Sequence, residues 1–332
     1  MDRRYVSYRS GYYLDRRNRK MQCSKEFVFE GNAPFAECHA STLLLLPGEE
    51  VLAAWFGGTK EGTEDVMIWL SRRTAGIWSV PQCVTKEVGI PHWNPVLFLQ
   101  ADGTVVLYYK IGHRISTWKT MVMESRDLGH TWSEARELVP GDEGGRGPVK
   151  NKAIYCSDGR ILAPASIEQG PWRCFVDISA DGVQWQKHPI PVSREDVNMI
   201  QPSLWEWPMG EVHGLLRTNA GFIYRTDSAD FGETWSTAYA IDIPNNNSGL
   251  DGVHLGNGRI ALVCNPVEKD WGPRSPLTLF LSEDNGITFQ KWMDLETEPG
   301  EYSYPAILSD GKMLHICYTW NRKRIAYWQI RI

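Results

Sequence analysis

The chain has 332 residues, of which 42% are hydrophobic and 23% are charged, and its formal net charge is −5. A negative charge of this size offers no basic field to nucleic acid or to an anionic membrane surface, so neither is an expected partner. The first residues lack the apolar core of a signal peptide, and no stretch approaches the ~20 apolar residues of a spanning helix. We therefore expect a cytoplasmic protein.

Six strand–turn–strand hairpins follow one another along the chain. In each, a short run rich in β-branched or aromatic residues precedes a turn glycine, and a second such run follows it. The run 96–99, for example, comes before Gly103 and the run 105–108 comes after it. No run longer than about ten residues has a helical period, so the sequence predicts an all-β chain. The six turn glycines are Gly48, Gly103, Gly159, Gly210, Gly258 and Gly311.

A second pattern, Ser-x-Asp-x-Gly-x-Thr-aromatic, recurs about every fifty residues, a period typical of solenoids and propellers. Full copies span 125–132, 228–235 and 282–289, a shortened copy spans 179–185, and a worn first copy ends at Trp78. We interpret the Asp as a hydrogen-bond acceptor across a tight turn, the Gly as the residue with positive φ, and the aromatic as an anchor beneath the turn. These aspartates are therefore structural and not catalytic.

Six hairpins, five of them followed by the Asp phrase, predict six four-stranded units, and therefore one six-bladed β-propeller domain over residues 1–332. The last unit lacks an Asp phrase and ends in the run 325–330. We expect a strand from the N-terminal segment, which contains the run 27–29, to complete this last blade and remove its exposed edge.

Metals and cofactors are not expected. The seven cysteines are odd in number and scattered, without the close pairing typical of zinc sites, and they are interpreted as reduced thiols. The eight histidines are dispersed, and no Gly-rich loop joins a strand to a helix.

The innermost strands of a propeller all begin on one face, so equivalent residues form a ring around one mouth of the channel. Such mouths are the usual place for a ligand site, although some ring residues can serve only to solvate the channel. Counting nine residues back from each turn glycine gives His39, Asn94, Lys150, Gln201, Gly249 and Tyr302. Counting seven forward gives Trp55, Lys110, Ser166, Arg217, Asn265 and Tyr318.

The loops after the second strands add two more charged residues to the candidate ligand site. They are Asp65 in the first unit and Arg274 at a similar place in the fifth. Asn265 and Asp251 are candidates for binding sugar hydroxyls. Trp93 is either a sugar-stacking residue or a core aromatic.

The Asp phrases resemble the bacterial neuraminidase repeat, and residues 30–332 resemble the sialidase superfamily of six-bladed propellers, in its branch of BNR-repeat proteins. The segments that carry this resemblance are Trp-Phe-Gly-Gly-Thr at 55–59, Trp-Asn-Pro-Val-Leu-Phe at 93–98, Lys-Asn-Lys at 150–152, Gln-Pro-Ser at 201–203 and Tyr-Ser-Tyr-Pro at 302–305.

The resemblance implies roles for several of these residues. Arg217 and Arg274 match two of the three arginines that bind the substrate carboxylate in sialidases, Tyr302 matches the nucleophile, and Asp65 matches the acid/base residue. Two positions depart from the family pattern: His39 replaces the first arginine, and Gln201 replaces the glutamate that activates the tyrosine.

These departures have chemical consequences. Two arginines can still bind a carboxylate. Without the glutamate, a phenol of ordinary pKa is a weak nucleophile unless Lys150, Lys152 or the arginines lower that pKa. Tyr304 and Tyr318 complete the expected contacts with an acidic carbohydrate.

Three functions remain open on the sequence alone. The first is an exo-acting glycosidase on a terminal acidic sugar, with Asp65 as the proton donor and Tyr302 at the anomeric carbon. The second is a lyase in which the arginines neutralise a uronate carboxylate while His39 or Tyr302 removes the adjacent proton. The third is a glycan-binding propeller without catalysis.

Overall fold

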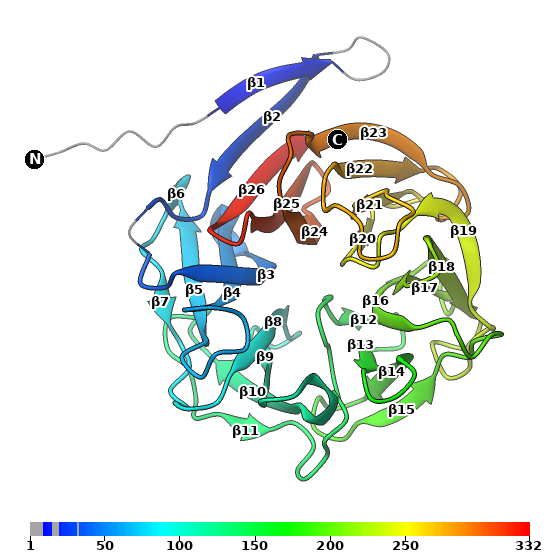
Figure 1. Cartoon of the computed structure of the whole chain (residues 1–332), viewed down its shortest axis with the longest axis horizontal. Coiled ribbons are helices and arrows are strands. Elements are labelled where there is room, and N and C mark those ends of the chain that lie inside the picture. Colours follow the sequence, from blue (N-terminus) through cyan, green and yellow to red (C-terminus); the bar gives the residue numbers. More distant parts are fainter. Residues whose placement is uncertain (1–8, 15–19, 32) are drawn as a thin grey trace, which may run out of the picture.

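Six antiparallel sheets surround a central axis as the blades of a propeller (Figure 1). The computed structural model describes residues 9–14, 20–31 and 33–332. Within those ranges the only helical segments are two single turns of 3₁₀-helix, η1 (Pro47–Glu49) and η2 (Ile115–Thr117). The prediction of an all-β, six-bladed propeller is confirmed.

The first three blades each contain four strands in chain order, counted outward from the axis, and β7 adds a short pairing to β5 of the first blade. The strands of the first blade are β3 (Glu37–Leu46), β4 (Glu50–Gly58), β5 (Met67–Thr74), β6 (Ile77–Trp78) and β7 (Gln82–Cys83). Those of the second are β8 (His92–Leu99), β9 (Val105–Ile111), β10 (Lys119–Ser125) and β11 (Arg136–Glu137). Those of the third are β12 (Ile154–Tyr155), β13 (Ile161–Ile167), β14 (Arg173–Ser179) and β15 (Gln186–Pro189).

Blades four and five repeat this order, and blade six combines both ends of the chain. The strands of the fourth blade are β16 (Met199–Glu206), β17 (Val212–Thr218), β18 (Phe222–Ser228) and β19 (Tyr239–Pro244). Those of the fifth are β20 (Asp251–His254), β21 (Ile260–Cys264), β22 (Leu277–Ser282) and β23 (Gln290–Glu296). Those of the sixth are β24 (Tyr302–Ser309), β25 (Met313–Trp320), β26 (Arg324–Arg331), β2 (Lys20–Phe27) and β1 (Arg9–Leu14).

The strand β2 from the N-terminal segment pairs antiparallel with β26, so the start of the chain covers the outer edge of the last blade (Figure 1). Its residue Cys23 packs in one core cluster with residues of blades five and six. The ring is thereby closed by pairing between two ends of the chain that are far apart in sequence.

The Asp phrases form the tight turns that the sequence predicts. The Asp127 carboxylate accepts hydrogen bonds from the backbone N–H groups of His130 and Thr131, at 3.1 and 2.8 Å, and from the Thr131 hydroxyl at 2.6 Å. Gly129 has a φ of 91°, and its neighbourhood is filled by side chains such as Leu52. A side chain at this position would meet both strain and a clash.

Four innermost strands carry a β-bulge near their start, where two residues face one on the neighbouring strand. A bulge re-aims side chains and is common beside functional sites. In three of the four blades a proline follows the residue with positive φ. The residues with positive φ at the bulges are Ala40, Asn94, Gln201 and Tyr304, with values of 56°, 41°, 56° and 55°.

Among the described residues, no helix has the length and apolar character needed to span a membrane.

Candidate active site

Tyr304 lies at the bulge of β24 and is surrounded by cationic side chains. The guanidinium carbons of Arg217 and Arg274 lie 5.8 and 5.7 Å from the centre of its ring, and the Lys150 ammonium lies 6.0 Å from it. Arg217 Nη1 donates a hydrogen bond of 2.9 Å to the phenolic oxygen. This tyrosine is therefore the aromatic group on which the cations of three different blades converge.

Gln201 lies at the equivalent bulge of β16 and faces the same phenol. Its Nε2 lies 3.5 Å from the Tyr304 oxygen, and its Oε1 accepts a hydrogen bond of 3.2 Å from Arg217 Nη1. Arg217, near the end of β17, is also held by its Nε, which donates to Asn247 Oδ1 at 2.9 Å. The amide of Gln201 thus occupies the place beside a phenol that the family resemblance gives to a carboxylate. Unlike a carboxylate, an amide is not a base near neutral pH, so it cannot take the proton of the phenol.

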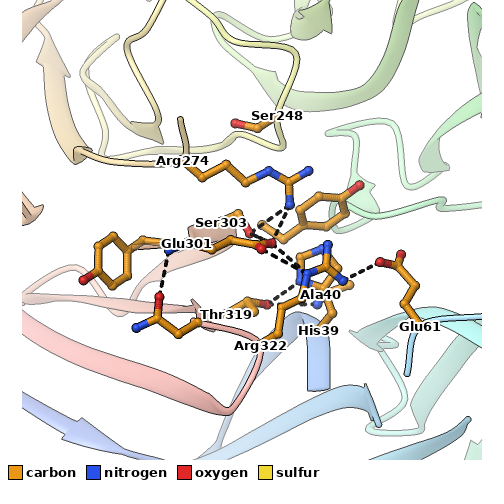
Figure 2. A network of polar contacts seen from close by, with 12 residues as sticks. His39, Ala40, Glu61, Ser248, Arg274, Glu301, Ser303, Thr319 and Arg322 are labelled. Carbon is orange, nitrogen blue, oxygen red and sulfur yellow. Dashed lines mark hydrogen bonds and ion pairs between the residues drawn. The ribbon is translucent and has the colours of Figure 1, made fainter. Parts of the chain in front are cut away.

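A second polar network joins Arg274 to the hairpin between β25 and β26 (Figure 2). Glu301 accepts from Arg274 Nη1 at 2.8 Å and from Arg322 Nε at 2.9 Å. Arg322 also pairs with Glu61 on the loop of the first blade. Arg322 has a φ of 53°, a conformation that costs free energy in a residue with a side chain. Two carboxylates therefore hold both guanidiniums in place beside the channel mouth.

His39 packs against Tyr304, with 4.2 Å between the two ring centres. Its Nδ1 lies 3.0 Å from Thr319 Oγ1, and no described residue contacts its Nε2 by a hydrogen bond (Figure 2). Burial and the positive charges of Arg322 and Arg274 lower the pKa of His39 well below its ordinary value. The imidazole is therefore neutral near pH 7 and does not serve as a third cation.

Tyr302 does not lie in this cluster, which corrects its predicted place as the nucleophile. Its side chain is buried in the core of blade six beside Trp320. Burial and the negative charges of Glu296 and Glu298 raise its pKa, which makes it a still weaker nucleophile. The ring position belongs to Tyr304.

The error has a geometric cause. The turn glycine Gly210 is the fourth residue after the end of β16 at Glu206, whereas Gly311 is the second residue after the end of β24 at Ser309. A fixed count of nine residues therefore reaches the bulge of β16 but passes that of β24 by two residues.

Tyr318 is also placed elsewhere than predicted. In the register of β25, Thr319 rather than Tyr318 is equivalent to Arg217, since Thr319 pairs with Ser303 as Arg217 pairs with Ile200. A shift of one residue sends a strand side chain to the opposite face. Tyr318 is accordingly fully buried, and its hydroxyl donates to Glu296 at 2.5 Å.

Asp65 is bound within its own loop, which does not support its predicted role as the proton donor. Its two carboxylate oxygens accept hydrogen bonds from the hydroxyls of Thr63 and Thr59, at 2.5 and 2.7 Å, and from the Thr59 N–H at 2.8 Å. These bonds lower its pKa. A proton donor needs the opposite shift, so we assign Asp65 to ordering the loop that carries Glu61.

The predicted lysine and aspartate contacts are used by the scaffold. Lys150 donates to Asn151 Oδ1 at 2.8 Å and to the carbonyls of Leu250 and Pro305, and burial lowers its pKa to about 8. Lys152 pairs with both oxygens of Asp251 at 2.8 Å. These groups tie the blades together and leave little capacity for a sugar.

The remaining predicted site residues are buried, and two of them have structural roles. Asn265 donates to the carbonyls of Pro276 and Tyr302, both at 2.9 Å, so it is structural. Trp93 is a buried core aromatic whose Nε1 donates to the Gly112 carbonyl at 2.9 Å. Asn94 lies buried at the bulge of β8, equivalent in register to Gln201 and Tyr304.

Several residues of the site were not predicted from the sequence. Glu301 and Ser303 flank Tyr302 in the sequence, and Thr319 follows Tyr318, so a correct register would have found them. Arg322 lies in a hairpin turn that no repeat marks.

The site thus offers guanidinium groups, a phenol, a neutral imidazole and an amide around one mouth. Among the described residues, Arg217 Nη2 and Arg274 Nη2 have no hydrogen-bond partner, so each guanidinium retains donors for an anion. The arrangement can bind a carboxylate and place a phenolic oxygen next to it.

Comparison with known proteins agrees with this fold. A family model described as a BNR repeat-like domain matches residues 49–316. No curated protein matches the chain by sequence.

Several solved structures are similar in fold. The Hadza microbial sialidase Hz136 has a TM-score of 0.78 and 16% identity, covering 93% of this chain and 68% of that one. A protein of unknown function from Dyadobacter fermentans DSM 18053 has a TM-score of 0.76 and 16% identity, covering 98% and 99%. The intramolecular trans-sialidase from Ruminococcus gnavus, in complex with oseltamivir carboxylate, has a TM-score of 0.72 and 14% identity, covering 92% and 97%. At these identities the likeness shows the fold alone. Because the matched model spans well over half of the sequence, the chain belongs to the BNR repeat-like, sialidase-like family of β-propellers.

Proposed function

We propose that the protein is an exo-acting glycoside hydrolase that removes a terminal sugar bearing a carboxylate. The observation that carries the proposal is that the guanidinium carbons of Arg217 and Arg274 lie 5.8 and 5.7 Å from the centre of the Tyr304 ring, and that Arg217 donates a hydrogen bond of 2.9 Å to its phenolic oxygen. The fold shared with sialidases supports a glycosidase of this class.

The two arginines would bind the substrate carboxylate. Guanidinium groups match carboxylates in planar, bidentate geometry, and charged hydrogen bonds of this kind are about twice as strong as neutral ones. Glu301 neutralises part of the charge of Arg274 and fixes its direction, which limits the entropy lost on binding.

Tyr304 would face the anomeric carbon next to that carboxylate. Its oxygen either attacks this carbon or stabilises the positive charge that develops on it as the glycosidic bond breaks. Gln201 positions the phenol without taking its proton. Over the whole reaction the anomeric carbon gains the oxygen of water, and the leaving oxygen gains a proton.

A second function, that of a uronate lyase, is favoured by one observation. The imidazole of His39 lies against Tyr304, and its lowered pKa leaves it unprotonated near pH 7, although the same shift makes it a weak base. In this reaction His39 removes the proton beside the carboxylate, the electron pair forms a carbon–carbon double bond, the C–O bond breaks, and the Tyr304 hydroxyl protonates the leaving oxygen.

The test is incubation of the purified chain with a panel of acidic oligosaccharides, including terminal 2-keto-3-deoxy acids and uronates. Products are identified by mass spectrometry and by the ultraviolet absorbance of an unsaturated uronate. The Tyr304→Phe variant serves as the control for a contaminating enzyme.

Each outcome decides between the functions. Release of a sugar with the addition of one water supports the hydrolase, and a water-free product that absorbs in the ultraviolet replaces it with the lyase. Binding without any product would leave a glycan-binding protein and overturn the proposed activity.

A further inference from the structure

One carboxyl group near the arginine cluster has no place in the site described above. Glu168 follows β13 directly, at the start of the hairpin that leads to β14. Side chains alternate between the two faces of a strand, so Glu168 continues the face of Ser166. Ser166 Oγ accepts a hydrogen bond of 3.4 Å from the backbone N–H of Gln201, so this face of blade three is turned toward blade four.

The packing below confirms which way this face points. Leu162 lies on the same face of β13 as Ser166. Cys174 pairs with Ser166 from the neighbouring strand β14, so its side chain lies on this face too. Both belong to a core cluster that includes Met199 and Leu216 of blade four. Glu168 therefore follows the face of β13 that meets blade four, and the charge of Arg217 acts on its carboxyl group. It also lines a small pocket with Ile115, Ser116 and Trp118 of blade two.

Glu168 differs from the other carboxylates around the mouth. Glu301, Glu61, Asp65 and Asp251 each accept hydrogen bonds from neighbouring side chains. Glu168 is half-buried, and none of the residues that the structure describes forms a hydrogen bond or an ion pair with its carboxyl group. Burial raises its pKa, and the charge of Arg217 only partly opposes this shift.

Two tryptophans connect the hairpin that carries Glu168 to Arg217. Trp172 belongs to the hairpin that Glu168 begins, and its ring centre lies 6.4 Å from that of Trp271 on the loop of blade five. The Arg217 guanidinium carbon lies 5.8 Å from the Trp271 ring. Trp271 is 63% exposed and has a φ of 52°, so a large apolar ring is held toward solvent at a conformational cost. Exposed aromatic faces of this kind can pack against the apolar face of a sugar.

We propose that Glu168 donates the proton to the leaving oxygen, within a leaving-group subsite formed by Trp172 and Trp271. The inference rests on the proposed hydrolase function. The glycosidic C–O bond breaks, its electron pair stays on the leaving oxygen, and this oxygen takes the proton of the Glu168 carboxyl group. Water then supplies the oxygen that bonds to the anomeric carbon, and one of its protons restores Glu168.

The test measures kcat/KM of the wild-type enzyme and of the Glu168→Gln variant on the same two substrates. One substrate has a sugar as its leaving group, and the other has a 4-nitrophenol, which leaves without protonation. Loss of a proton donor typically lowers the rate by about 10²- to 10⁴-fold, so kcat/KM for the sugar substrate falls by this factor while that for the aryl substrate changes little. Glu211→Gln, at an exposed turn of blade four, is the matched control and retains both activities.

The pH profile gives an independent readout. A proton donor must be protonated, so wild-type activity on the sugar substrate falls as the pH rises through the pKa of Glu168. This falling limb is absent in Glu168→Gln and is retained in Glu168→Asp. Trp271→Ala raises KM for the sugar substrate but not for the aryl substrate.

The possible results separate the two ideas. Equal losses on both substrates, or an unchanged pH profile in Glu168→Gln, would overturn the role of Glu168 and leave the hydrolase intact. A wild-type protein that cleaves neither substrate would overturn the proposed function, and the role of Glu168 with it.

Discussion

The Asp phrases at the outer turns and the arginine cluster at the channel mouth are both rich in polar groups, but they differ in how completely those groups are used. The Asp127 carboxylate accepts bonds from backbone N–H groups and from two hydroxyls, so its capacity is filled. At the mouth, Arg217 and Arg274 keep unused donors, and Glu168 has no described hydrogen-bond partner. Filled capacity is typical of a structural group, and unfilled capacity in a cluster of largely buried charged groups indicates a binding site.

The largest expected effect on kcat is the difference between substituting Tyr304 and substituting Tyr302, the two tyrosines of β24. Tyr304→Phe removes the only polar atom of the central ring and is expected to lower kcat by about 10²- to 10⁴-fold, with a smaller change in ligand affinity. Tyr302→Phe removes a hydroxyl from the core and is expected to leave kcat unchanged. Steady-state kinetics on the substrate identified from the panel checks both. A Tyr302→Phe enzyme that is inactive while folded, beside an active Tyr304→Phe, would restore the original assignment.

The second largest effect is expected from substituting an arginine at the channel mouth, compared with one at the outer rim. Arg217→Ala removes charged hydrogen bonds that are worth about 1.5–3 kcal/mol each, and we expect the affinity for the acidic ligand to fall by about tenfold or more. Arg160→Ala is the matched control, since Arg160 pairs with Asp158 and Glu233 at the outer rim. Isothermal titration calorimetry measures both. Equal affinities in the two variants would remove the distinction between mouth and rim.

The smallest effect is expected at the Asp phrase. Hydrogen bonds to the ionised carboxylate hold the pKa of Asp127 well below its ordinary range. An acid with a depressed pKa stabilises the folded state above its unfolded pKa, and this contribution is lost as the pH falls toward the folded pKa. Asp127→Asn should therefore lower the midpoint of thermal unfolding at pH 7 by a few degrees at most, with a smaller difference at pH 3 and unchanged activity. Calorimetry at the two pH values checks this, and a difference that grows in acid would refute the account.

The fold could be predicted because its signals are local and repeated. A turn glycine such as Gly129 and the Asp two residues before it specify a turn without reference to the rest of the chain. Five such phrases, together with the six turn glycines of the hairpins, then indicate the number of blades.

The site could be predicted only in part, because it depends on register and on contacts between blades. Arg217 and Gln201 were found because their blade has the standard turn length, whereas Tyr302 was chosen in place of Tyr304 because the last turn is shorter. The ion pair of Lys152 could not be predicted either, since its partner Asp251 lies 99 residues away in the sequence. Spacing identifies which residues can reach the mouth but not which of them are already occupied.

Lys150 has a consequence for the path of a ligand. It precedes the innermost strand of blade three, yet it donates to the Pro305 carbonyl in blade six, which lies on the opposite side of the ring. A side chain that bridges opposite blades crosses the axis, so Lys150 obstructs the centre of the ring at this level. A sugar chain cannot thread through the ring here. Under the proposed function, a sugar chain would enter and leave by the same opening, as an enzyme that removes the last residue of a chain requires.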